Sequence, residues 1–242
     1  VFLAVRDDER LECALHATVD RLYEIPDEEL RQREFVPVFR EFFKKLGHDR
    51  LIEGLLAERP LVGALVDQCV VREAPRTKAQ SAELLVQISH HGEQRIRRTL
   101  VIQICPQSFL DTGRFITLMR RELRHAADML DERFDYERDV FTGDPSQQNL
   151  RRDRYRVLWD VYVAGRLERE GFGVDGEKNR LRRSFGRVFS KIATDAHGHA
   201  FDRVFDAAVW THREFMDWAL DPDMLLVSSP DWTPVVGHTA CS

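Results

Sequence analysis

The sequence lacks any long run of apolar residues. No stretch of its 242 residues approaches the roughly 18 consecutive apolar residues that a membrane-spanning helix needs, so a transmembrane protein is not expected. Val1–Val5 is also too short for the apolar region of a secretory signal peptide, and charged residues follow it directly. Because the chain starts with Val rather than Met, a fragment and an alternative start both stay open.

Cysteine and lysine are both scarce. The four cysteines are widely scattered and form no C-x-x-C pair, so neither a disulfide framework nor a zinc finger is expected. This cysteine usage favours a reducing compartment, and we expect a cytoplasmic protein. Only five of the 36 basic residues are lysines, a bias typical of genomic base composition, and the net charge of −5 argues against nucleic acid as a partner. Nothing in the sequence indicates an oligomeric state.

The apolar pattern predicts an α+β protein in which a small sheet lies between two groups of helices. We expect one domain over residues 1–227, followed by an irregular tail over 228–242. Its parts are N-terminal helices in 1–60, a sheet and one long helix in 66–132, and C-terminal helices in 147–220. The predicted helices cover Asp7–Tyr23, Pro26 to Gly47, Leu51–Glu58, Arg114–Glu132, Gln148–Glu170, Gly176–Ile192 and His199–Leu220.

Three short segments in the middle of the chain change to the period of β-strands. Val66–Val71 is rich in β-branched residues, and Ala82–Ser89 and Thr99–Cys105 alternate between apolar and polar side chains. His90–Glu93 contains glycine and predicts a hairpin turn. We therefore expect a small, mostly antiparallel sheet of about three strands, flanked by helices.

The most informative segment is Met119–Leu130, in the predicted long helix after the sheet. On a helical wheel Glu122 falls on the face that carries Phe115 and Met119, and His125 lies at the edge of that face. Burying a carboxylate or an imidazole without a partner costs a few kcal/mol. The sequence therefore predicts either a buried polar network or a metal site.

This segment resembles the active-site helix of zincin metallopeptidases, whose signature is H-E-x-x-H. The resemblance covers roughly residues 66–170 and implies a small sheet, a zinc ion, and a peptide or protein substrate. It makes Glu122 the catalytic general base and His125 the second zinc ligand. Arg121 stands where the first ligand should be, and a protonated guanidinium cannot bind a metal.

The remaining ligands implied by the resemblance lie further along the chain. Asp160 is the best match for the third ligand, because it is the only charged residue within Val157–Ala164. Asp128 lies one turn beyond His125 and could bind the metal or orient that histidine. Glu168 is a weaker candidate, since its neighbours are charged.

Two function hypotheses follow from the arginine at position 121. In the first, the chain is a zincin-like metallohydrolase or its catalytically impaired descendant. Either Arg121 replaces the metal charge by pairing with Asp160, Asp128 or Glu122, or His125, Asp160 and Asp128 keep an altered zinc site. In the second, the resemblance is due to chance, and the chain is a non-catalytic interaction or structural protein with a buried network of Arg121, Glu122, His125 and Asp160.

Other motifs favour structural roles. No second E-x-x-H supports a di-iron site, and the sequence contains no G-x-S-x-G, P-loop or G-x-G-x-x-G. Cys13 near His16 predicts a packed cysteine, and His197-Gly198-His199 predicts capping or exposure at a helix start. The arginine runs at 151–154 and 180–183 predict a solvated helix face, with an anion or partner surface as the alternative.

Overall fold

The computed structural model describes residues 1–6, 8–89, 95–137, 141, 144–192 and 194–227. The chain divides into two compact units, unit 1 (Val1–Leu130) and unit 2 (Asp131–Ser242). The expectation of one domain over 1–227 stays a prediction. The expected hairpin turn at His90–Glu93 and the expected irregular tail at 228–242 lie outside the described residues.

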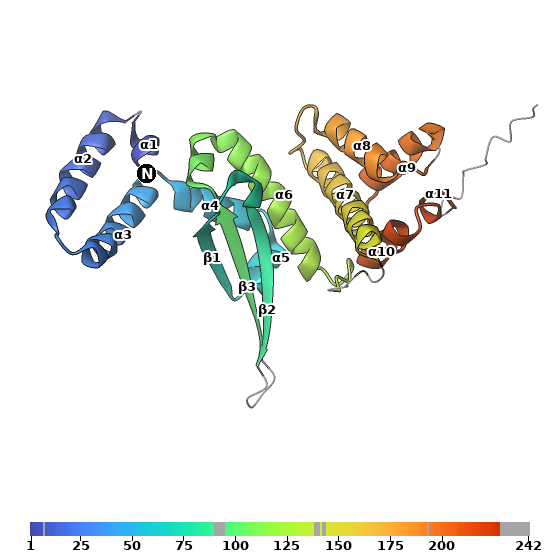
Figure 1. Ribbon diagram of the computed structural model, residues 1–242, viewed down its shortest axis with the longest axis horizontal. Coiled ribbons are helices and arrows are strands. Elements are labelled where there is room, and N and C mark those ends of the chain that lie inside the picture. Colours follow the sequence, from blue (N-terminus) through green and yellow to red (C-terminus); the bar gives the residue numbers. More distant parts are fainter. Residues whose placement is uncertain (7, 90–94, 138–140, 142–143, 193, 228–242) are drawn as a thin grey trace, which may run out of the picture. The chain divides into compact units, whose positions relative to one another are not determined.

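The N-terminal part of unit 1 is helical, as predicted (Figure 1). Asp27 caps the longest of its helices by accepting a hydrogen bond from the Leu30 amide at 2.8 Å, and Gly47 follows that helix with a φ of 73° that favours glycine. A helix that the sequence analysis did not predict begins at Pro60, in the first-turn position that suits proline. The helices are α1 (Phe2–Val5), α2 (Glu9–Val19), α3 (Glu28–Lys45), α4 (His48–Ala57) and α5 (Pro60–Leu65).

The sheet has three strands, β1 (Gln68–Glu73), β2 (Ser81–Ser89) and β3 (Arg95–Ile104), in the order β1-β3-β2. β2 and β3 pair antiparallel, but β1 pairs with β3 in parallel. The prediction of a mostly antiparallel sheet was therefore wrong for one of the two pairings. The chain between β1 and β2 crosses from one sheet edge to the other, and β3 then fills the place between them.

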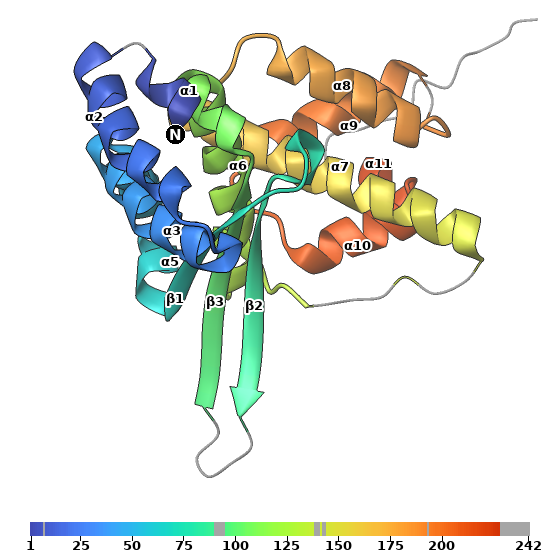
Figure 2. The ribbon, with the colours of Figure 1, turned by 60° about the vertical axis from the view of Figure 1, so that its left-hand side comes forward.

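Helix α6 (Thr112–Leu130) carries the candidate motif and packs on the sheet (Figure 2). Asp111 caps it, accepting a hydrogen bond from the Arg114 amide at 3.0 Å. Its buried face packs with side chains of the sheet, α4 and α5 in one hydrophobic cluster. That face centres on Leu123 and Ala126, so the helical wheel was wrong to place Glu122 within it: Glu122 lies at the border and is half-buried.

Unit 2 is a group of helices, α7 (Pro145–Arg169), α8 (Glu177–Val188), α9 (Thr194–Asp206), α10 (His212–Leu220) and α11 (Met224–Val227). The predicted helix over His199–Leu220 was wrong, because the chain leaves α9 after Asp206 and starts α10 anew. A capping box begins α10: Thr211 Oγ1 accepts from the Glu214 amide at 3.3 Å, and Glu214 accepts from the Thr211 amide at 2.9 Å.

The centre of unit 2 is α7, whose middle is buried on nearly all sides. The helix contacts α8, α9 and α10, and aromatic rings fill much of the space between these helices. Among all described helices, none is both long enough and apolar enough to cross a membrane.

Candidate functional site

The three residues of the zincin-like motif lie along α6 at the edge of its buried face, and Asp128 lies within that face. Arg121, Glu122 and His125 are half-buried, and Asp128, one turn further on, is only 2% exposed. Because the helix repeats every 3.6 residues, the same packing that buries Leu123 holds its neighbours at the boundary with solvent. The side chains of Arg121, Glu122 and His125 are therefore partly shielded from water but can still contact other side chains or a ligand.

Arg121 forms an ion pair with the neighbouring Glu122. Its Nε and Nη2 atoms donate to Glu122 Oε1 at 3.2 and 2.8 Å, and the two side chains are 32% and 16% exposed. Glu122 is thus one of the three partners predicted for Arg121. The guanidinium supplies a positive charge to the carboxylate that the resemblance makes a general base.

The preceding residue, Arg120, makes a different ion pair that the sequence analysis missed. It donates from Nε and Nη2 to the two carboxylate oxygens of Glu58, at 2.9 and 2.7 Å, and so ties α6 to the residue directly after α4. The hydrogen bonds from Arg120 hold the pKa of Glu58 below its ordinary value. No local sequence signal could reveal this pair, because its members are 62 residues apart.

The predicted ligands divide between the two units. His125, with its Nδ1 atom buried, and Asp128 belong to unit 1, whereas Asp160 lies on α7 in unit 2. The neighbours of Asp160 on that helix, Trp159 and Val161, are buried as the apolar stretch indicated, but Asp160 itself is half-buried. Since these residues come from separate units, a site shared by them stays a prediction.

The donor set of α6 alone does not fit a catalytic zinc site. Such a site takes three protein ligands, and α6 offers only His125 and Asp128 besides Glu122, whose Oε1 accepts two hydrogen bonds from Arg121. Within the described ranges, no three His, Cys, Asp or Glu side chains gather closely enough to hold a metal ion. By itself, α6 therefore carries an arginine–carboxylate pair and too few ligands for a catalytic zinc ion.

The weaker site candidates of the sequence analysis, Glu168, Cys13 and His197, show no sign of a metal site in the part of the chain that the structure describes. Glu168 is exposed, as its charged neighbours indicated. Cys13 is exposed, so the prediction that it packs in the interior was wrong: it lies outside the buried face of α2, which carries Leu15 and Val19. His197 forms a hydrogen bond between Nε2 and the Phe189 carbonyl oxygen at 2.9 Å.

The chain was compared with models of protein families, with curated proteins and with solved structures. None of the three comparisons finds a match.

Proposed function

We propose that this protein is a catalytically impaired descendant of a zincin-like metallohydrolase, in which α6 retains the active-site helix and Arg121 has replaced its first zinc ligand. The ion pair between Arg121 and Glu122 is the observation that supports this proposal. An arginine at this position removes a ligand and provides a fixed cation next to the carboxylate. Arginine at position 121 thus accounts both for the departure from the H-E-x-x-H motif and for how the charge of Glu122 is balanced without a metal.

The proposed impairment follows from the chemistry of the pair. A general base needs a carboxylate oxygen that can accept a proton from its substrate. Oε1 of Glu122 accepts two charge-assisted hydrogen bonds from Arg121, and with an arginine in place of the first ligand no zinc would activate a water for Oε2. The protein would then bind a peptide or protein segment without hydrolysing it.

A second candidate function is that of an interaction or structural protein unrelated to zincins. The ion pair between Arg120 and Glu58 favours it, because it shows that an arginine of α6 stabilises packing within unit 1. In this alternative, Arg121 and Glu122 are part of a polar network with no catalytic ancestry.

The test restores the missing ligand with Arg121→His. We expect the purified wild-type protein to contain no stoichiometric zinc by mass spectrometry, and R121H to contain about one zinc per chain. Arg114→His, a change of the same kind at an exposed position of α6, is the matched control and should contain no more zinc than the wild type. Casein hydrolysis is measured on the same samples, with none expected for the wild type.

Two results would contradict the proposal in different ways. Stoichiometric zinc in the wild type, with casein hydrolysis that Glu122→Gln abolishes, would identify an active metallohydrolase. Absence of stoichiometric zinc from both the wild type and R121H would rule out the zincin-like ligand set and favour the second candidate.

A further inference from the structure

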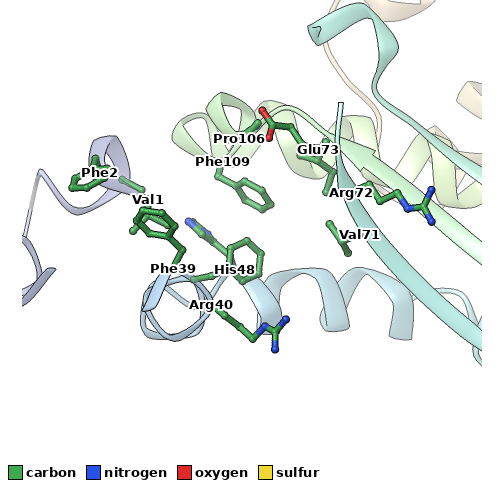
Figure 3. A pocket seen from close by; sticks show the side chains of 13 residues that line it. Val1, Phe2, Phe39, Arg40, His48, Val71, Arg72, Glu73, Pro106 and Phe109 are labelled. Carbon is green, nitrogen blue, oxygen red and sulfur yellow. The ribbon is translucent and has the colours of Figure 1, made fainter. Parts of the chain in front are cut away.

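Unit 1 contains a cavity of about 570 Å³ that is unrelated to the motif on α6. It lies between the side chains of α1 and α3 on one side and those of β1 and the short 3₁₀ helix Pro106–Leu110 on the other (Figure 3). Its volume falls within the range of sites that bind small molecules. The cavity is therefore large enough for a ligand rather than for a few waters only.

Aromatic rings form its inner wall. The rings of His48 and Phe109 lie 4.5 Å apart, and Phe43 packs edge-on against both, at 5.2 Å from His48 and 5.4 Å from Phe109. Phe39, one turn before Phe43 in α3, also lines the cavity. Because these rings brace one another, they present a preformed apolar surface that would lose little freedom when a ligand binds.

The wall lies where two hydrophobic clusters of unit 1 approach each other. Phe39 packs against the cluster of α1, α2 and α3, whereas Phe43 and Phe109 pack against the cluster of the sheet, α4, α5 and α6. Each cluster has its own buried core, so neither needs to close over the cavity in order to form. This arrangement explains how an apolar space of this size persists within one unit.

Charged side chains at the border of the cavity carry a surplus of positive charge. Arg40, Arg72 and Glu73 all line it and are exposed, and the structure shows no ion pair for any of them within its described ranges. His48 also lines the cavity, and burial lowers its pKa, which disfavours a positive charge on its ring. Two guanidinium groups and one carboxylate thus lie at the border, and this surplus of positive charge favours an anion.

We propose that this cavity binds an amphipathic carboxylate, a small molecule with an apolar body and a single carboxylate group. The apolar body packs among the rings of Phe39, Phe43 and Phe109, and the carboxylate pairs with Arg40 or Arg72 at the border. Guanidinium groups suit this role because they match a carboxylate with two parallel hydrogen bonds and shed water more readily than an ammonium group. The proposal does not depend on the zincin-like ancestry of α6.

The first experiment measures the preference for a negative charge. The neutral dye N-phenyl-1-naphthylamine reports on the cavity by fluorescence, and decanoate and decylamine compete with it at pH 7. We expect decanoate to displace the dye at about tenfold lower concentration than decylamine. Equal competition by the two compounds would overturn the assignment of a carboxylate ligand.

Two sets of variants place the ligand in this cavity. The double variant R40Q/R72Q should bring decanoate and decylamine to within about twofold of each other, whereas R33Q/R76Q, with the same change of charge at exposed arginines outside the cavity, should keep the wild-type preference. Val71 is exposed at the border, so V71W should fill the space and weaken decanoate binding about tenfold or more. The matched control is L85W, at an exposed apolar position of β2.

The variants also make the proposal refutable. If V71W binds decanoate as the wild type does while its circular dichroism shows a folded protein, the ligand lies elsewhere. An unchanged preference in R40Q/R72Q would likewise contradict the role of the two arginines.

Discussion

Three arginines that join the helices of unit 2 differ in their acceptors from the two neighbouring arginines of α6 in unit 1. In unit 2 the guanidinium groups donate to backbone carbonyl oxygens: Arg154 to Val188 at 3.0 Å and Ala219 at 3.3 Å, Arg169 to Phe205 at 2.8 Å and Ala207 at 2.6 Å, and Arg203 to Leu225 at 2.6 Å. In unit 1, Arg120 and Arg121 of α6 donate to the carboxylates of Glu58 and Glu122.

The two kinds of acceptor, a backbone carbonyl and a carboxylate side chain, differ in whether they can change. A carbonyl at the end of a helix is an acceptor that no substitution removes, so an arginine bound to it fixes one helix against another. A carboxylate can be mutated, protonated or offered to a ligand, so its ion pair can change with the conditions. The candidate site and the cavity both belong to the unit in which the arginines of α6 pair with carboxylates.

The closest helix contact of unit 2 provides the largest expected effect. A Cβ atom at Gly165 of α7 would lie 1.8 Å from the Phe205 carbonyl oxygen of α9, the same oxygen to which Arg169 donates. We expect Gly165→Ala to lower the free energy of unfolding by about 3 kcal/mol, because the two helices must move apart. Urea unfolding followed by circular dichroism measures this loss.

Gly186 in α8 is the matched control, since a Cβ atom there meets no atom within 4 Å. Gly186→Ala should raise the unfolding free energy by about 0.5–1 kcal/mol, through the higher helix propensity of alanine. If G165A and G186A lose the same stability, the close approach of α7 and α9 at Gly165 is not what limits the side chain at that position.

The second prediction compares one arginine from each unit. Arg154 is 6% exposed, and Arg154→Met would leave the buried Ala219 and the half-buried Val188 carbonyl oxygens without their donor, at an expected cost of about 2 kcal/mol. Arg121→Met removes a partly exposed ion pair between neighbouring residues, so the expected cost is below about 1 kcal/mol. Thermal unfolding of the two variants tests this order, and a larger loss in R121M would reverse the comparison.

The sequence predicts the fold where the signal is local. The spacing of Leu15 and Val19 on α2 and the glycine after α3 place helices close to their observed bounds. The parallel pairing of β1 could not be predicted, since it depends on which sheet edge the chain reaches after β1. The break before α10 could have been predicted, because Thr211 and Glu214 have the spacing of a capping box.

The candidate site follows the same rule. The pairing of Arg121 with Glu122 was among the alternatives because an arginine in the place of a zinc ligand could replace the metal charge beside that carboxylate, and their position on one helix follows from periodicity. The partner of Arg120 and the wall of Phe43, His48 and Phe109 join residues far apart in the sequence. Such contacts depend on how the elements pack, and a single sequence carries no local signal for them.

The smallest expected effect concerns the ion pair between Glu58 and Arg120 in unit 1. Both side chains are 25% exposed, so at pH 7 Glu58→Gln should cost about 1 kcal/mol of unfolding free energy. The pKa of Glu58 is lower in the folded protein than its ordinary value of 4.5, and its contribution to stability is therefore complete above that pH and lost as the pH falls further. The difference between wild type and E58Q should shrink as the pH falls below 4.5.

Glu53→Gln, at an exposed position of α4, controls for the loss of a surface carboxylate and should show no such pH-dependent difference. In unit 2, R154M should keep its loss of stability over the same pH range, because the acceptors of Arg154 are carbonyl oxygens that do not titrate. A difference between wild type and E58Q that stays constant down to pH 3 would show that Glu58 acts through packing. Unit 1 would then resemble unit 2, and its ion pairs on α6 would be structural as well.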